Sequence, residues 1–213
     1  MRHWKLVVIL FWLSFALFAL FNRYAAIRGF ALGDTDDNLR MAQVRALLDG
    51  QNWFDLVQHR LDRAHGGANI HWSRLVDLPV AGLILAFRLV MSGPEAERWA
   101  VAIAPLLAFL PILFALALTT RRLVDPRAVP LVLATMIFAV STTGMVQPLR
   151  IDHHGWQLAF LALALTGLAD PDRRRGGITT GVASALSLAI GLEMLIYIAL
   201  MGAAHVLLQV VNI

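Results

Sequence analysis

The sequence predicts an all-α fold, a polytopic transmembrane helical bundle that forms a single domain over residues 1–213. Three observations support this: 59% of the residues are hydrophobic, only 15% are charged, and the apolar residues are gathered in long blocks. A soluble domain of this size normally has about 25% charged residues. Apolar runs of about 20 residues are typical of membrane spans, because lipid leaves the backbone no hydrogen-bond partner outside its own helix.

The predicted spans follow the apolar blocks in order. The first covers residues 6–22 and is expected to stay uncleaved, because its apolar run is long for a signal peptide and no clear cleavage site follows it. The next apolar segment, residues 77–91, is short and contains Arg88, so we expect it to lie in the membrane interface. The remaining spans are predicted at 97–119, 128–147, 156–169, 178–194 and, if the last apolar stretch crosses twice, 195–213.

The distribution of basic residues predicts the orientation of the chain. With residues 77–91 in the interface, every short basic loop falls on one side, which the positive-inside rule makes the cytoplasmic side. These basic residues are Arg2, Lys5, Arg121, Arg122, Arg127 and Arg173 to Arg175. The N-terminus is then cytoplasmic, and residues 23–96 form a long external loop that contains short interfacial helices. We expect an integral protein of a bacterial inner membrane, with its acidic loops in the periplasm.

The composition also excludes several classes of function. The sequence has no cysteine, which excludes disulfides and thiolate metal sites. A sequence pI near 10.6 would suit a nucleic-acid partner, but there is no basic-aromatic patch or known motif for one. Membrane orientation explains the basic residues instead. The expected surroundings are membrane lipids, without nucleic acid.

Three carboxylates, those of Asp34, Asp36 and Asp37, stand within four positions shortly after the first span. One explanation is local, because Asp34 can cap a helix and acidic residues favour the positive end of a helix. The alternative is a cation site, since crowded carboxylates repel one another unless a cation neutralises them, and oxygen ligands suit Mg²⁺ or Mn²⁺. Three acids exceed what capping needs, so all three are candidates for a catalytic site.

A second ionisable motif, Asp152-His153-His154, lies between two apolar spans and is predicted to face the same external side. Asp152 and His154 can both reach one ion if the loop is extended, with His153 pointing away. The alternative is that Asp152 only caps the following helix. Glu193, the only acid in the apolar stretch 178–213, is expected at the same face as an additional ligand or proton carrier.

These motifs, in this order, resemble the GT-C fold membrane glycosyltransferases, and most closely the catalytic subunits of oligosaccharyltransferases. The matching features are a first span, the aspartate motif of residues 34–40, the segment 52–55 (Asn-Trp-Phe-Asp), a two-span hairpin with a basic inner loop, and the Asp-His-His motif. The resemblance covers roughly residues 1–200. Family members are several times longer, so it implies the N-terminal part of such an enzyme, or one chain of a split enzyme that a second chain completes.

The resemblance implies a GT-C-like bundle that uses a polyprenyl-phosphate- or polyprenyl-diphosphate-linked sugar and a divalent metal, Mg²⁺ or Mn²⁺. The implied metal ligands are Asp34, Asp152 and His154, and the implied catalytic residues are Asp34, Asp36, Asp37 and Asp152. Guanidinium groups pair well with phosphate oxygens, so the donor phosphate is expected to contact Arg40, Arg74 and Arg150. The acceptor is left open.

A transporter or a non-catalytic membrane scaffold is the competing interpretation. Transporters usually carry ionisable residues or broken helices at the middle of the bilayer and often show inverted repeats. The predicted spans carry almost no charge and show no internal repeat. A scaffold would tolerate the loss of Asp34 and Asp152, whereas a metal enzyme would not, so substituting these residues separates the two classes.

Overall fold

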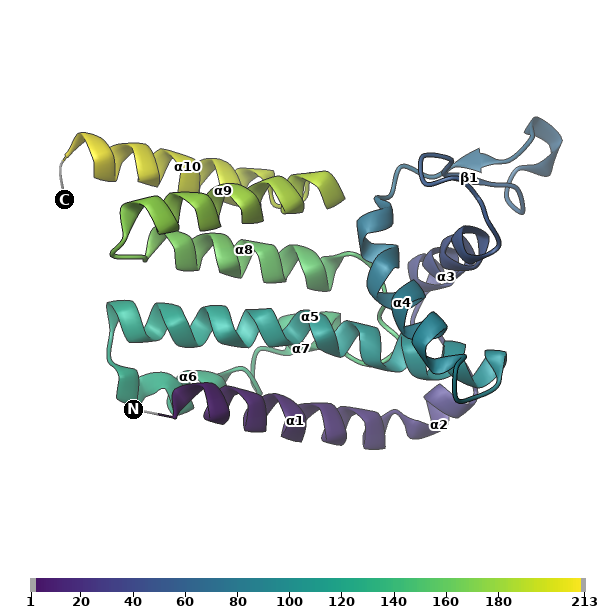
Figure 1. Cartoon of the computed structure of the whole chain (residues 1–213), viewed down its shortest axis with the longest axis horizontal. Coiled ribbons are helices and arrows are strands. Elements are labelled where there is room, and N and C mark those ends of the chain that lie inside the picture. The colour runs from purple at the N-terminus through teal and green to yellow at the C-terminus, as the bar shows by residue number, and fades with distance from the viewer. Residues whose placement is uncertain (1–2, 212–213) are drawn as a thin grey trace.

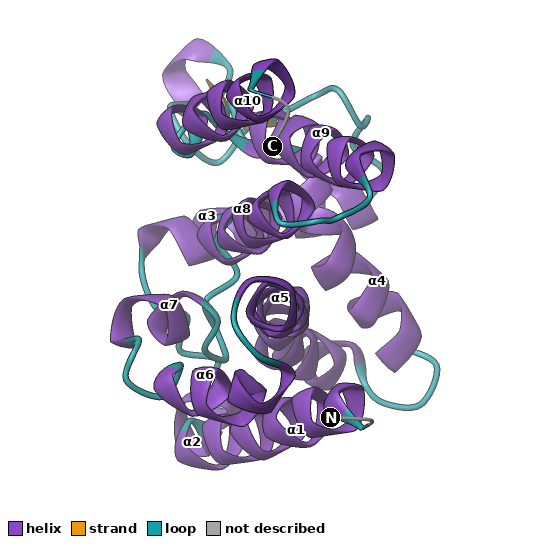
Figure 2. Ribbon diagram, turned by 90° about the vertical axis from the view of Figure 1, so that its left-hand side faces the viewer, coloured by secondary structure: helices purple, strands orange, loops and turns teal. Residues whose placement is uncertain are grey.

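The computed structural model describes residues 3–211, and over that range the chain is almost entirely helical, with ten α-helices (Figure 1). The prediction of an all-α fold is therefore confirmed. Five longer helices run along one common axis and stack side by side when viewed from the end (Figure 2). In the order of the stack they are α1 (Trp4–Asn22), α5 (Gly93–Leu123), α8 (His154–Leu168), α9 (Arg173–Ile190) and α10 (Leu195–Val210).

The second helix of this stack, α5, contacts α1, α4, α6 and α8. Its inner faces are rich in buried alanine, and small side chains let neighbouring helices approach closely. Trp12 of α1 donates a hydrogen bond from its indole Nε1 to the backbone oxygen of Leu106, 2.7 Å away. Phe15 and Phe109 pack their rings 4.6 Å apart in the same interface. Helices α1 and α5 are thus joined by both a hydrogen bond and apolar contact.

One end of the stack carries a group of short elements, and α3 and α4 lie across the axis of the long helices (Figures 1 and 2). The helices here are α2 (Tyr24–Arg28), α3 (Thr35–Leu48), α4 (Asp77–Phe87) and the 3-10 turns η1 (Arg63–His65) and η2 (Arg74–Val76). An antiparallel pair of two-residue strands, β1 (Val57–Gln58) and β2 (Ala68–Asn69), completes the group. The sequence analysis did not predict these strands, because two residues are too few for an alternating pattern.

The predicted span 128–147 is not one continuous helix. The structure divides it into the 3-10 turn η3 (Pro126–Ala128), helix α6 (Val129–Thr135) and helix α7 (Val140–Met145), with turns between α6 and α7. The break falls at residues 136–139, and the helix that follows it, α7, is short and consists largely of Val140, two threonines and Gly144, residue types that are weak helix formers. A mean apolar character over 20 residues therefore overestimated the length of helix.

Among the described residues, two helices, α1 and α5, are long and apolar enough to cross a membrane. Two further apolar helices, α8 and the segment Leu195–Leu208 of α10, are shorter. The first span predicted from the sequence matches α1 closely, and the span predicted at 97–119 lies inside α5. The spans predicted at 156–169 and 178–194 overlap α8 and α9, and that predicted at 195–213 overlaps α10, except for residues 212–213, which lie outside the described residues.

Candidate functional site

The two acidic motifs meet at the end of the bundle where α3 and α4 lie. Asp34 precedes α3 and is its N-cap, because its Oδ1 accepts hydrogen bonds from the backbone N–H groups of Asp36 and Asp37, 3.0 and 3.1 Å away. Asp34 thus has the capping role that the sequence analysis considered for it. The cap also fixes the direction of the carboxylate, since one oxygen is held by the helix and the other is left to face the second motif.

Asp37 joins the two motifs. Its side chain is fully buried, and its Oδ1 accepts hydrogen bonds from the backbone N–H groups of Ile151 and Asp152, 2.8 and 3.1 Å away. Leu149, two residues before Ile151, has a left-handed backbone with a φ of 77°, and its own N–H is bonded to the backbone oxygen of Val101. Such a conformation is rare for a residue other than glycine, and here it turns the chain so that the following amides point at Asp37.

Arg150 lies between three carboxylates. Its Nη1 contacts the Oδ2 atoms of Asp34 and Asp37, the latter at 3.1 Å, and its Nη2 lies 2.5 Å from Oδ2 of Asp152. The Oδ1 of Asp152 accepts a hydrogen bond from the backbone N–H of His154 at 3.0 Å. Each of the three carboxylates therefore has one oxygen held by backbone amides and the other directed at one shared cation. We call these four residues, Asp34, Asp37, Asp152 and Arg150, the acidic cluster.

The acidic cluster is short of positive charge. Three ionised carboxylates and one guanidinium carry a net charge of −2. Burial raises the pKa of Asp37 to about 6; the neighbouring Asp34 and Asp152 add to this effect, and Arg150 offsets only part of it. Burial would also raise the pKa of Asp34, but the hydrogen bond and charge of Arg150, together with the backbone N–H groups of Asp36 and Asp37, outweigh burial and lower that pKa. A divalent cation would supply the missing charge.

The donor set of the cluster has the chemistry of a site for Mg²⁺ or Mn²⁺, because it offers three carboxylate oxygens that the backbone already orients. Among residues 3–211, no three His, Asp or Glu side chains are arranged to hold an ion as they stand. At the cluster, the Arg150 guanidinium contacts all three Oδ2 atoms at which an ion would bind. Arg150 would therefore have to turn aside, toward the solvent to which it is partly exposed.

The histidines differ from the expectation. His153 is buried rather than pointing away, and its Nε2 lies 2.9 Å from Oε1 of Glu193. Burial lowers the pKa of His153 despite this contact. The predicted ligand His154 touches the cluster through its backbone N–H, and its ring lies 4.4 Å from the ring of His153. Asp37, rather than the His154 ring, is thus the side chain that contacts Arg150 together with Asp34 and Asp152.

Glu193 reaches the same end of the molecule, as the sequence predicted. It lies in the turn between α9 and α10, and its second oxygen accepts a hydrogen bond from Nε2 of Gln157. Burial would raise its pKa, but the hydrogen bonds from Gln157 and His153 hold the pKa at about 2. Gln157 was missed from the sequence, although it is the only polar side chain in the first turn and a half of α8 beyond the Asp-His-His motif.

Arg40 and Arg74 are not placed to bind a donor phosphate in this structure. They are 1% and 3% exposed, and both contact Asp77, at 3.0 and 3.4 Å. Arg74 also donates to the backbone oxygens of Gln43 and Asp55. The two arginines therefore tie α3 and the loop of residues 51–76 to the start of α4. Asp77 was overlooked in the sequence, where its position three residues after Arg74 was a usable signal.

Asp36 does not belong to the cluster either. Its side chain is exposed, and only its backbone N–H contacts Asp34. Of the seven predicted site residues other than His154, the structure therefore brings together Asp34, Asp37, Asp152 and Arg150, and it leaves Asp36, Arg40 and Arg74 outside the cluster.

An apolar cavity of about 210 Å³ lies beside the acidic cluster. It opens between η2, α4, α8 and α9, and Trp156, four residues after Asp152, forms part of its wall. The lining residues are Leu75, Pro79, Trp156, Phe160, Leu186 and Ile190. None of the protein-family models, curated proteins or solved structures with which we compared the chain matches it. The geometry of the site must therefore carry any functional conclusion by itself.

Proposed function

We propose that the chain is a membrane-embedded, divalent-metal-dependent glycosyltransferase, or part of one, whose donor is a sugar linked to polyprenyl phosphate or diphosphate. The observation that carries the proposal is the convergence of three carboxylates, from two segments more than 110 residues apart, on one cation. A cap or a simple surface ion pair does not need three oriented carboxylates with a net charge of −2.

The surface of the bundle supports a membrane-embedded, polytopic arrangement. Large apolar side chains of α1 face outward, with Leu17 67% and Phe21 82% exposed, and α10 exposes Ile196 to 73%. Outside a bilayer such surfaces would be unfavourable, because contiguous apolar patches cost free energy in water. In this proposal α1, α5, α6–α7, α8, α9 and α10 cross the bilayer, and the acidic cluster lies at the external face.

The metal would be held by Asp34, Asp37 and Asp152, and when bound it would neutralise the charge that develops on the leaving phosphate. Arg150 would then be released from its carboxylates. A guanidinium beside the site can donate two parallel hydrogen bonds to phosphate oxygens. In this proposal Arg150 contacts the donor phosphate, as predicted. It competes with the cation for the three carboxylates only when no donor is bound.

The apolar cavity supports a lipid-linked donor rather than a soluble nucleotide sugar. The cavity faces the hydrocarbon region in the proposed orientation, and the indole of Trp156 also lies near Asp152 at the edge of the cluster. A polyprenyl chain in this cavity would place its phosphate at the acidic cluster. Asp37 is committed to the cluster and Asp36 is exposed, so in this proposal Asp36 is the acid available to orient an acceptor.

Binding of farnesyl diphosphate to the purified chain, with and without Mn²⁺, tests this function. We expect Mn²⁺-dependent binding that Asp152→Asn abolishes and that Leu186→Trp weakens, because the larger ring fills the apolar cavity. Arg60→Gln, an exposed arginine outside the site, is the control. Equal binding by wild type and Asp152→Asn would contradict the proposal, and the acidic cluster would then be the loop-joining device of a membrane scaffold.

A further inference from the structure

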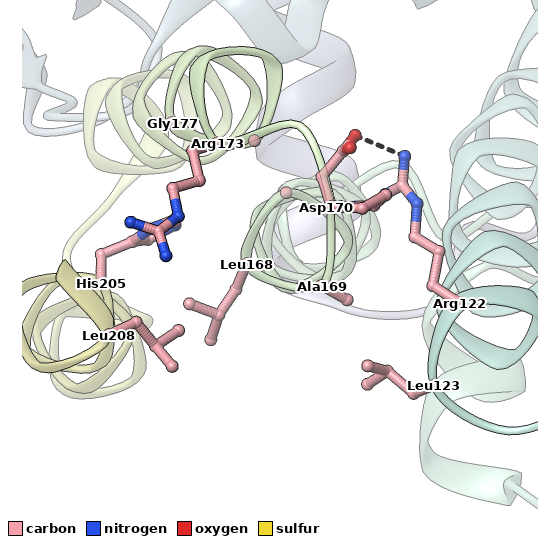
Figure 3. A pocket seen from close by; sticks show the side chains of 12 residues that line it. Arg122, Leu123, Leu168, Ala169, Asp170, Arg173, Gly177, His205 and Leu208 are labelled. Carbon is pink, nitrogen blue, oxygen red and sulfur yellow. Dashed lines mark hydrogen bonds and ion pairs between the residues drawn. The ribbon is translucent and has the colours of Figure 1, made fainter. Parts of the chain in front are cut away.

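A second cavity, of about 560 Å³, is shown in Figure 3. It lies at the opposite end of the bundle from the acidic cluster. Helix α8 connects the two ends, since Asp152 precedes its first residue and Asp170 follows its last. The cavity is bounded by the last turn of α5, the turn between α8 and α9, and the C-terminal half of α10. The proposed glycosyltransferase chemistry makes no use of it.

The walls of this cavity combine basic and apolar side chains. Arg122 approaches from α5, and Arg173 extends from the start of α9 toward His205 of α10 (Figure 3). Leu123, Leu168 and Leu208 face the space between them (Figure 3). Leu123 is 66% exposed. This much apolar surface would be unfavourable if the cavity held only water and a small anion. The cavity is therefore amphipathic.

The one acidic side chain in the wall is already neutralised. Asp170 accepts hydrogen bonds from Nη2 of Arg122 at 2.5 Å, and from Nε and Nη2 of Arg175 at 2.8 and 2.7 Å. Its side chain is only 2% exposed, so it presents almost no negative surface to the cavity. Arg122 also donates to the backbone oxygen of Thr166 at 2.6 Å, which fixes its guanidinium at the cavity wall.

The surrounding segments add further positive charge. Residues 121–127 and 170–175 contain six arginines and three aspartates, a net charge of +3. The cavity also lies at the N-terminus of α9, an 18-residue helix whose dipole favours anions there. Gly177 lines the cavity at this point and leaves the backbone uncovered, since nothing lies within 4 Å of an added Cβ, whereas Gly176 is buried against Gly167 of α8. Charge, helix dipole and shape therefore all favour an anion at the same place.

We propose that this cavity binds an anionic phospholipid, with the phosphate between Arg122 and Arg173 and an acyl chain along the three leucines. Basic pockets between membrane helices are suited to anionic headgroups. A free phosphate or a nucleotide would use the arginines but not the leucines, so the apolar half of the wall selects a lipid. The inference depends on the membrane placement of the bundle and not on the metal site.

Lipid retention in detergent tests the proposal. Purified protein is exchanged with phosphatidylglycerol or phosphatidylcholine, and the lipid that stays bound is counted by native mass spectrometry. We expect wild type to retain one phosphatidylglycerol in preference to phosphatidylcholine, and 10 mM inorganic phosphate not to displace it. Arg173→Gln should weaken retention about fivefold, the effect of removing one arginine near an anionic headgroup.

The adjacent Arg174→Gln is the matched control, because Arg174 is exposed and does not line the cavity. Leu208→Ser, at the apolar side of the cavity, should weaken retention of phosphatidylglycerol without changing the response to phosphate. Equal retention of the two lipids, equal loss in Arg173→Gln and Arg174→Gln, or displacement by inorganic phosphate would overturn the proposal. The Mn²⁺ affinity of the acidic cluster should be the same in all these variants, so failure here would not be confused with failure of the metal site.

Discussion

Asp36 and Asp37 are neighbours in the sequence, yet α3 leaves one carboxylate in solvent and buries the other against the backbone of residues 151–152. The sequence identified both as candidates, because spacing alone predicts a cluster of acids after the first span. It did not separate them, since that depends on the rotation of α3 relative to a loop more than 110 residues away. The same limit applies to Arg40 and Arg74, whose burial depends on Asp77.

The raised pKa of Asp37 predicts a pH-dependent stability in the metal-free protein. Its pKa of about 6 in the folded state lies above its ordinary value of 3.8, so the folded protein holds this proton more tightly than the unfolded chain does. This stabilising contribution is present below about pH 4 and is lost as the pH rises through about 6. Asp37→Asn cannot ionise and still offers an oxygen to the amides of Ile151 and Asp152.

In EDTA, the stability of Asp37→Asn relative to wild type should therefore be greater at pH 7 than at pH 4. Thermal unfolding in detergent at a series of pH values measures this difference. Asp36→Asn, which changes an exposed carboxylate, should show no such trend. A difference for Asp37→Asn that stays constant from pH 4 to 7 would show that the carboxylate is not buried beside Asp34 and Asp152.

Helices α8 and α9 pack closely against each other at Gly167 and Gly176. A Cβ atom added at Gly167 would lie 2.4 Å from Oγ1 of Thr180 and 2.7 Å from the backbone oxygen of Gly176. Thr180 Oγ1 also donates to the backbone oxygen of Ala164 at 2.9 Å, so this crossing has both close packing and an interhelical hydrogen bond. The existence of α8 and α9 was predictable from apolar runs, but the start of α9 at Arg173 and the point where the two helices pack were not.

Gly167→Ala should lower the free energy of unfolding by about 1–3 kcal/mol, because the added methyl group meets backbone that cannot yield cheaply. Gly181→Ala is the matched control in α9, since nothing lies within 4 Å of its added Cβ and alanine favours the helix by about 1 kcal/mol. Denaturation of the purified variants measures both effects. Equal stability of Gly167→Ala and Gly181→Ala would contradict the close approach of α8 and α9.

The whole molecule places the acidic cluster at one end and the arginine-rich segments 121–127 and 170–175 at the other (Figure 1). This separation was predictable, because apolar blocks and basic loops alternate in the sequence and the positive-inside rule assigns them to opposite faces. The broken helix α6–α7 and the two cavities were not, since they depend on side-chain packing between distant segments.

The chain has no cysteine, so single cysteines can report the orientation of these ends. Arg63 and Arg174 are exposed at opposite ends of the molecule. In intact cells, a membrane-impermeant maleimide should label Arg63→Cys and should label Arg174→Cys only after the membrane is permeabilised. The reverse pattern would invert the proposed orientation, and labelling of both in intact cells would exclude a polytopic arrangement with the ends on opposite sides.

The most direct test of the acidic cluster is Mn²⁺ binding by the purified protein, followed by electron paramagnetic resonance. Wild type and Asp36→Asn should each bind one Mn²⁺ with the same affinity, because Asp36 lies outside the cluster. Asp37→Asn and Asp152→Asn should each bind it more weakly, by at least the roughly 10- to 100-fold that loss of a residue supporting a ligand costs, since each removes one of the converging carboxylates. The absence of a bound ion in the wild type, or an equal affinity in all four proteins, would contradict a metal site at the acidic cluster.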